Sequence, residues 1–165
     1  MRASQYVLMA LMLMAGPSAS PAHAESPEEW IALGTRVHGG FGAFIPLGIR
    51  IGLDAVARLH AGPRGLAVVY HDSVASPCAC FADGVAIATS ASVGQRTLTI
   101  AAEPAPEGAI AVVVIRPRAG GAGLKYTVPA AALARLGAMN KDRDPRGRYD
   151  AVMRADGLFQ VEPVQ

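Results

Sequence analysis

The first hydrophobic pattern with helical spacing follows a strong start signal. Ser26 is placed to cap the helix, Pro27 to occupy its first turn, and Glu29 to complete a capping box with Ser26. Apolar positions then recur on one face until Gly39 and Gly40, which end the pattern. We therefore expect a helix from about residue 27 to residue 38.

The next pattern predicts a second helix, from near Pro46 to about His60. Its small residues Gly48, Gly52 and Ala55 fall on one stripe. Because small side chains allow a close backbone approach, we expect another element to pack tightly against this stripe.

The remaining patterns alternate irregularly between short strands and helices. We expect strands at 66–70, 96–102, 109–116, 124–128 and 158–161, and helices at 82–91, 129–139 and 149–154. The strands at 96–102 and 109–116 are predicted to form an antiparallel hairpin, and residues 140–148 a charged loop. This order predicts one α+β domain, with a mixed or antiparallel sheet and helices packed on it.

The N-terminus has the pattern of a secretory signal peptide. Residues 6–15 are apolar, a Gly-Pro-rich break follows, and Ala22-His23-Ala24 has the form of a cleavage box. The apolar run is shorter than the roughly 20 residues that a membrane span needs. We expect residues 1–24 to be a signal peptide and residues 25–165 an exported, periplasmic or secreted domain; a retained N-terminal anchor is the alternative.

Charge narrows the range of partners. Removing Arg2 from the 15 basic residues leaves 14, against 13 acidic ones, so the exported part is almost neutral. Nucleic-acid binding is favoured by a clustered basic face. We expect no nucleic-acid partner, and no membrane association after cleavage.

The segment from His71 to Cys80 carries candidate ligands for a metal ion. His71, Cys78 and Cys80 have donor atoms suited to zinc or copper, with Asp72 as a neighbour that could orient a ligand. A Cys78–Cys80 disulfide and buried free thiols are together an equal alternative. The very small ring of such a disulfide predicts a redox-labile bond.

The glycine-rich segment from residue 36 to residue 50 could line a binding site. His38 falls where one helix ends and another begins, and Arg50 would add a fixed positive charge. Backbone amides at a helix N-terminus favour an anion. Alternatively, His38 only complements the C-terminal end of the first helix, where a positive charge is favourable.

Two stretches resemble the FmdE-like family, which is named after formylmethanofuran dehydrogenase. Its first motif reads approximately H-G-H-x-C-P-G-x3-G-x-R-x-G, and the positions in register with it are His38, Gly39, Gly48, Arg50 and Gly52. Its second motif begins C-x-x-D, and the positions in register with it are Cys80, Asp83, Gly84, Val85, Thr89 and Gly94. The resemblance implies an α+β domain in which the two motifs meet.

The resemblance also implies a metal site, with zinc the first expectation and copper the second. Three ligand-type positions of the family are replaced here, by Gly40, Gly42 and Ala91. Of these positions only His38 and Cys80 keep ligand residues. Cys78 and His71 are additional donors that could rebuild a site with them, and a metal-free domain is the alternative.

The expected metal ligands are therefore His38, Cys80, Cys78 and His71, and the expected pocket residues for a small ligand are His38, Gly39, Arg50, Asp83 and Thr89.

Three functions follow from these expectations. The first is an exported accessory protein that binds a metal ion or a small ligand. The second is a non-catalytic structural member that associates with a partner, including a second copy as a homodimer. The third is a thiol-dependent enzyme that uses Cys80, with His38 or His71 as base. No acid–base pair at a compelling spacing favours the enzyme, so we prefer the binding role.

Overall fold

The computed structural model describes residues 25–62 and 64–165. The predicted signal peptide at 1–24 lies outside these residues. Over the described ranges, no helix has both the length and the apolar character needed to span a membrane. These ranges fold into five helices and one five-stranded mixed sheet, which confirms the predicted α+β class.

The sheet has the spatial order β2-β1-β3-β4-β5. The strands are β1 (Leu66–Asp72), β2 (Leu98–Ile100), β3 (Ala109–Pro117), β4 (Gly123–Pro129) and β5 (Gln160–Val164). β1 and β2 pair in parallel, and the other neighbouring strands are antiparallel. β3 lies in the middle and is buried along most of its length, in agreement with its strongly apolar sequence.

The predicted hairpin between residues 96–102 and 109–116 is wrong. β2 pairs with β1, which separates it from β3. β1 takes the position beside β3 because it buries more apolar surface: its Leu66, Val68 and Tyr70 are at most 1% exposed. β2 is a short strand at the edge of the sheet. The hairpin next to β3 is the one with β4, whose connecting loop has Gly120 and Gly121 at φ of 93° and 103°, a region that suits glycine.

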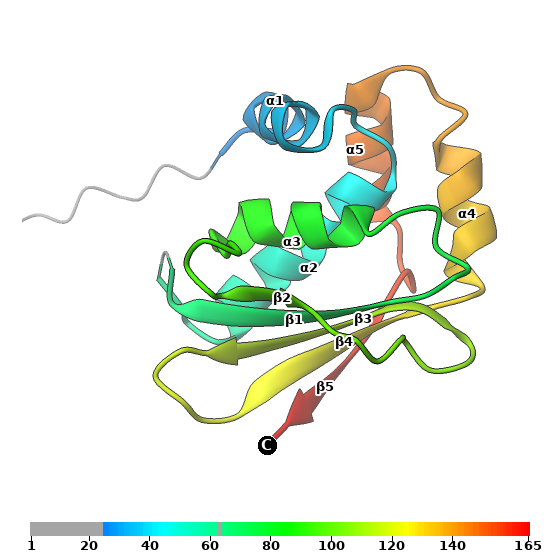
Figure 1. Ribbon diagram of the computed structural model, residues 1–165. Helices are drawn as coiled ribbons and strands as arrows, with labels where there is room; N and C mark the ends of the chain where they lie inside the picture. Colours follow the sequence, from blue (N-terminus) through cyan, green and yellow to red (C-terminus); the bar gives the residue numbers. More distant parts are fainter. Residues whose placement is uncertain (1–24, 63) are drawn as a thin grey trace, which may run out of the picture.

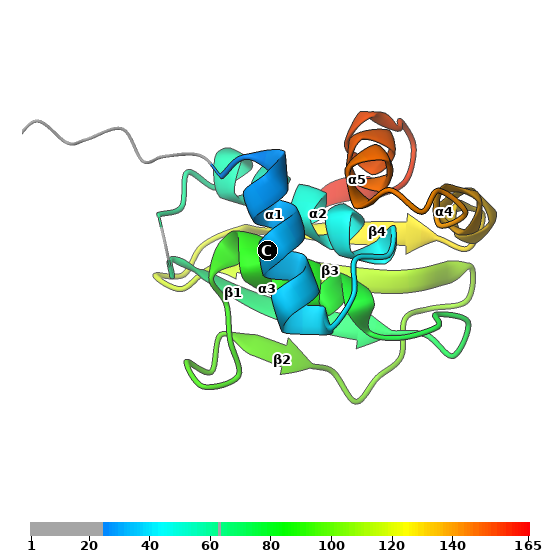
Figure 2. The same ribbon diagram turned by 90° about the horizontal axis from the view of Figure 1, so that it is seen from above.

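The helices lie over one face of the sheet (Figure 1), and the view from above shows α1 crossing over α3 while α4 and α5 lie to one side (Figure 2). They are α1 (Pro27–His38), α2 (Phe44–Arg58), α3 (Cys80–Thr89), α4 (Ala132–Met139) and α5 (Pro145–Arg154). The capping box of α1 is confirmed, because the Glu29 amide donates to Ser26 Oγ while the Ser26 amide donates to the Glu29 carboxylate.

Both α3 and α5 begin earlier than the sequence pattern predicts. α3 begins at Cys80 rather than Ala82, which places a cysteine in its first turn. α5 begins at Pro145 rather than Tyr149, so part of the expected charged loop is helical. α5 begins early because Asp144 caps it. The Asp144 side chain accepts hydrogen bonds from the amides of Arg146 and Gly147, and proline is favourable at the first helical position.

The glycine stripe of α2 packs against α3, as predicted. A Cβ atom added at Gly48 would overlap the Phe81 carbonyl oxygen and lie 2.9 Å from the Gly84 Cα. A Cβ at Gly52 would lie 2.6 Å from the Ala88 Cβ. Because both helices have glycine where they cross, their backbones come into close contact.

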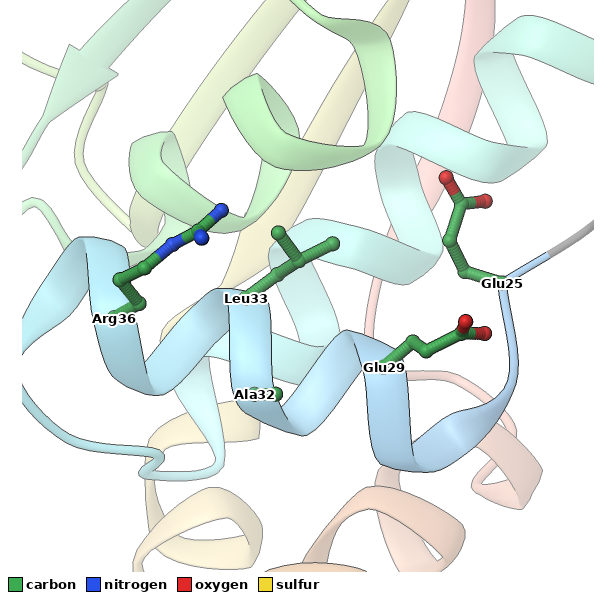
Figure 3. A pocket seen from close by; sticks show the side chains of 5 residues that line it. All are labelled: Glu25, Glu29, Ala32, Leu33 and Arg36. Atoms are coloured by element: carbon green, nitrogen blue, oxygen red, sulfur yellow. The ribbon is translucent and has the colours of Figure 1, made fainter.

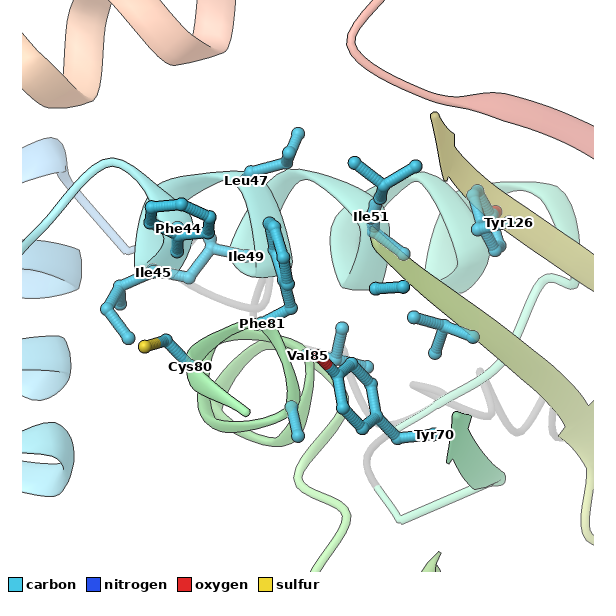
Figure 4. Close-up of a cluster of buried hydrophobic side chains, with 14 of the residues drawn as sticks. Phe44, Ile45, Leu47, Ile49, Ile51, Tyr70, Cys80, Phe81, Val85 and Tyr126 are labelled. Carbon is cyan, nitrogen blue, oxygen red and sulfur yellow. The ribbon is translucent and has the colours of Figure 1, made fainter. Parts of the chain in front are cut away.

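The core lies between α2, α3 and the sheet. Figure 4 shows α2 and α3 side chains packed together with tyrosines of the strands. Phe44 and Phe81 meet edge to face, with ring centroids 4.9 Å apart. Cys80 is drawn at the border of this cluster. The tight α2–α3 contact therefore fixes where the first turn of α3 lies.

Candidate metal and thiol site

His38 is the last residue of α1. The helix ends there because Gly39 has φ of 83°, and its amide donates to the Thr35 carbonyl in a left-handed cap. The His38 Nδ1 lies 2.8 Å from Asp83 Oδ2. The side chains of His38 and Asp83 are 29% and 39% exposed, so the pair is reachable from solvent.

Asp83 has two roles in this arrangement. It lies in the first turn of α3, where the helix dipole favours a negative charge. Its carboxylate accepts the Nδ1–H of His38, which leaves the lone pair on the other ring nitrogen, Nε2. Metal-ligating histidines commonly have such a carboxylate partner.

The two cysteines flank Ala79 at the start of α3 and are joined as a disulfide. Cys80 is 5% exposed, whereas Cys78 is partly exposed. Hydrogen bonds order the loop before them: the Ser76 amide donates to the Ser73 carbonyl, and the Ser76 hydroxyl donates to the Cys78 carbonyl. The sulfur positions are thus set by α3 on one side and by this loop on the other.

The structure brings His38, Cys78 and Cys80 together. One donor atom from each lies within 4.8 Å of the other two. Ligands of one tetrahedral zinc ion lie about 3.3–3.8 Å apart, given metal–ligand bonds of about 2.0–2.3 Å. The distance from His38 to the sulfurs is therefore at most about 1 Å longer than this spacing, whereas the two sulfurs are bonded to each other and would have to separate to act as two ligands. Metal ions bind thiolates, so the cysteines would have to be reduced.

His71 does not join this group among the described residues. Its Nδ1 lies 3.0 Å from the Glu103 carbonyl oxygen. Tyr70, its neighbour in β1, is fully buried beneath the helices. Successive side chains of a strand point to opposite faces, so His71 points away from them. This alternation is visible in the sequence and could have separated His71 from the other donors.

Arg50 also lies apart from the cysteines. Its Nη1 donates to the carbonyl oxygens of Val152, at 2.9 Å, and Ala155, at 2.5 Å. Its guanidinium carbon lies 5.4 Å from the centre of the Phe159 ring. Arg50 therefore ties α2 to the C-terminal segment.

Thr89 and Gly39 have backbone roles. The Thr89 hydroxyl donates to the Val85 carbonyl and accepts from the Ala91 amide, at the end of α3 opposite Cys80. That end is about 13 Å away, at 1.5 Å per helical residue. Gly39 forms the cap of α1. Of the residues expected around a small ligand, only His38 and Asp83 are in side-chain contact.

Asn140 is a residue that the sequence patterns did not single out. Its Oδ1 accepts a hydrogen bond of 2.6 Å from the Ala43 amide, in the loop between α1 and α2. A Cβ at Gly42 would lie 3.3 Å from this oxygen. The Asn140 side chain thus occupies the space beside Gly42. This contact joins residues far apart in the sequence, so only the fold reveals it.

Comparison with known proteins places the chain in a family. Residues 37–155 match the sequence profile described as FmdE, molybdenum formylmethanofuran dehydrogenase operon. The chain belongs to the FmdE family. A comparison with curated proteins finds no match.

The FmdE match spans His38, the disulfide and Asp83, and it ends at Ala155, where Arg50 holds the C-terminal segment. It confirms the expected resemblance over most of the chain. The family description does not state which residues bind a ligand; in this FmdE protein the donor atoms that lie together are those of His38, Cys78 and Cys80.

Two surface pockets lie along α1 and beside Cys78. A shallow one of about 360 Å³ follows α1 and is lined by Glu25, Glu29, Ala32, Leu33 and Arg36 (Figure 3). A second, of about 380 Å³, has Cys78 in its wall and is lined also by Asp72, Ser73, Val74, Ser76, Pro77, Ala101, Ala102 and Pro104. Only the second includes a sulfur of the site.

Electrostatics make Asp72 the charged group of this second pocket. The Tyr70 hydroxyl donates to Asp72 Oδ1 at 3.2 Å. Burial, with the Asp72 charge as a further cause, raises the pKa of Tyr70 well above its usual range. Tyr70 therefore stays neutral. The described residues that line this pocket include no cation, so no group in its wall balances the charge of Asp72.

Proposed function

We propose that this FmdE-family protein is an exported accessory protein that binds one thiophilic metal ion through His38, Cys78 and Cys80. The observation that carries the proposal is the convergence within 4.8 Å of donors from two segments, His38 at the end of α1 and the cysteines at the start of α3. The Asp83 contact supports it, because it leaves the His38 Nε2 free to bind a metal.

The donor set selects the metal. Two thiolates and one imidazole suit zinc or copper, whereas magnesium and calcium prefer oxygen ligands. Zinc is the first expectation, since three protein ligands and one open position are typical of zinc sites that exchange a fourth ligand. A small-anion site is less well supported, because Arg50 is engaged with backbone carbonyls elsewhere.

Oxidation state controls this function. In the Cys78–Cys80 disulfide neither sulfur is a thiolate, so the disulfide and the metal-bound form exclude each other. We therefore expect metal binding only after a two-electron reduction of the pair.

Titration with Co²⁺ tests the proposal. Reduced protein, kept without oxygen, should bind one Co²⁺ per chain with a thiolate-to-cobalt absorption band, and Zn²⁺ should displace it. The Cys78→Ser/Cys80→Ser double variant should lose the band. Loss of a ligand's hydrogen-bond partner typically lowers metal affinity by roughly 10–100-fold. Loss of the ligand itself should lower it by at least as much. His38→Ala should therefore bind at least about tenfold more weakly.

His71→Ala is the matched control. It removes an imidazole from the same protein, but one that hydrogen-bonds Glu103 instead of facing the sulfurs. Its affinity for Co²⁺ should equal that of the wild type. No binding by the reduced wild type, or equal losses in the His38 and His71 variants, would contradict the proposal.

Export and self-association are separate parts of the proposal. N-terminal sequencing of protein from the periplasm or medium should give Glu25 as the first residue, if cleavage follows Ala24. Recovery only from the cytoplasm, with Met1 retained, would contradict export. The mass in solution will decide whether the accessory protein acts as a monomer or a homodimer.

A further inference from the structure

The two cysteines of the Cys78–Cys80 pair differ in their exposure to solvent. Cys80 is almost fully buried at the N-terminus of α3, and Cys78 belongs to the wall of an open pocket. The two sulfurs of one disulfide therefore differ in access. A disulfide with one reachable sulfur and one protected sulfur can react in only one order.

We propose that this pair exchanges disulfides with a dithiol in a neutral or basic segment of a partner protein, which binds in the pocket beside Cys78. The activity goes beyond metal binding, since it needs no metal ion. It explains how the disulfide becomes the dithiol that a metal site requires.

The reaction is balanced by the partner's two thiols. A partner thiolate attacks Cys78 Sγ, the Cys78–Cys80 bond breaks, and Cys80 leaves as a thiolate. The partner's second thiolate then attacks the partner sulfur of the mixed disulfide and releases Cys78. Two electrons and two protons pass from the partner to this protein, and the partner ends with a disulfide.

The surroundings of Cys80 favour its role as the leaving group. It lies in the first turn of α3, whose backbone amides stabilise a negative charge. The His38 imidazole lies next to both sulfurs and is fixed by Asp83. Cys78 precedes α3 and lacks this helix N-terminus, so the two sulfurs of the pair have different environments.

The composition of the pocket selects the partner. Val74, Ala101, Ala102 and Pro104 give it an apolar side, and Val74 is fully exposed. Asp72 is the only charged residue among those that line it. Glutathione carries a net negative charge at neutral pH and is disfavoured here, whereas a neutral or basic peptide is complementary.

Single-cysteine variants test the order of attack. Reaction with the neutral reagent 2,2′-dithiodipyridine is followed in the presence of EDTA, so that no metal takes part. Cys80→Ser, which keeps the reachable Cys78, should react at least tenfold faster than Cys78→Ser. Equal rates, or faster reaction of Cys78→Ser, would overturn the proposal. Circular dichroism of both variants ensures that folded proteins are compared.

A second measurement tests the pocket. The probe is a neutral pentapeptide whose central cysteine is activated as a pyridyl disulfide, and the protein is Cys80→Ser. Adding Val74→Glu should slow the reaction with this peptide at least threefold more than it slows the reaction with dithiodipyridine. Val93→Glu is the matched control, because Val93 is 73% exposed and lies outside the pocket wall. Equal effects of the two substitutions on the peptide rate would overturn the pocket assignment.

The oxidised wild type gives the last test. A peptide carrying two cysteines should reduce it through a mixed disulfide on Cys78, seen by mass spectrometry after acid quenching. A mixed disulfide on Cys80 would contradict the order of attack. Failure of these exchange tests would leave Co²⁺ binding by chemically reduced protein intact, so the two proposals can fail separately.

Discussion

His38 and Arg50 come from one short segment, yet the fold gives them opposite surroundings. His38 contacts another side chain, Asp83, and lies beside two sulfurs on a partly exposed surface. Arg50 donates to two main-chain carbonyls and lies over an aromatic ring. Backbone carbonyls neither titrate nor exchange, so Arg50 is suited to hold the fold, whereas the His38 region keeps groups that can react.

The largest expected effect comes from the structural side of this comparison. Arg50→Ala should lower the free energy of unfolding by about 2–4 kcal/mol, because hydrogen bonds to a charged group contribute about 1.5–3 kcal/mol and the carbonyls lose their donor. Urea unfolding measures the change. The same variant, while folded, should bind Co²⁺ like the wild type. A loss of binding by the folded variant would show that Arg50 contributes to the His38 site, and would contradict the separation of the two regions.

The second effect belongs to the reactive side. Asp83→Asn should weaken Co²⁺ binding by about 10–100-fold, since the amide no longer holds His38 as a carboxylate does. Its unfolding free energy should change by less than about 1 kcal/mol, because the ion pair is partly exposed. Isothermal titration and urea unfolding of the same sample separate the two. Unchanged affinity would mean that Asp83 does not support a ligand.

Reduction of the disulfide should have a smaller effect on folding. The bond closes a ring with a sequence separation of 2, for which loop entropy gives at most about 1.5 kcal/mol of stabilisation. Reduced and oxidised wild type should therefore unfold at similar urea concentrations. A loss of several kcal/mol on reduction would make the disulfide structural and argue against a reactive pair.

The smallest effect is a pH dependence near Arg50. Tyr126 donates to Asp54 at 2.7 Å and meets Phe159 edge to face. Burial first, and then Asp54, raises the pKa of Tyr126 far above 10. Above pH 10 the folded protein therefore keeps a proton that the unfolded chain loses, so stability falls as pH rises, by about 1 kcal/mol between pH 10 and pH 11.

Tyr126→Phe should remove this part of the slope. Unfolding of the variant and the wild type at pH 8, 10 and 11 measures it, and metal binding at pH 8 should be the same in both. An equally steep loss of stability in the variant would assign the alkaline sensitivity to other groups.

Local patterns fixed much of the secondary structure. The capping box at Ser26, the glycine end of α1 and the apolar run of β3 each act within a few residues, so the sequence alone predicted them. The partner of β2 was not predictable in this way. Pairing depends on which strand buries more apolar surface in the assembled sheet, and the predicted hairpin of residues 96–102 with 109–116 does not form.

The candidate site divides in the same manner. The sequence by itself determined which residues carry donor chemistry, and the spacing of the family motifs paired the His38 region with the Cys80 region. Only the tertiary structure decided which donors meet. The tight glycine contact between α2 and α3 sets the first turn of α3 beside the end of α1, strand alternation turns His71 away, and the C-terminal segment engages Arg50. Such choices depend on contacts between residues far apart in the chain, which local patterns do not encode.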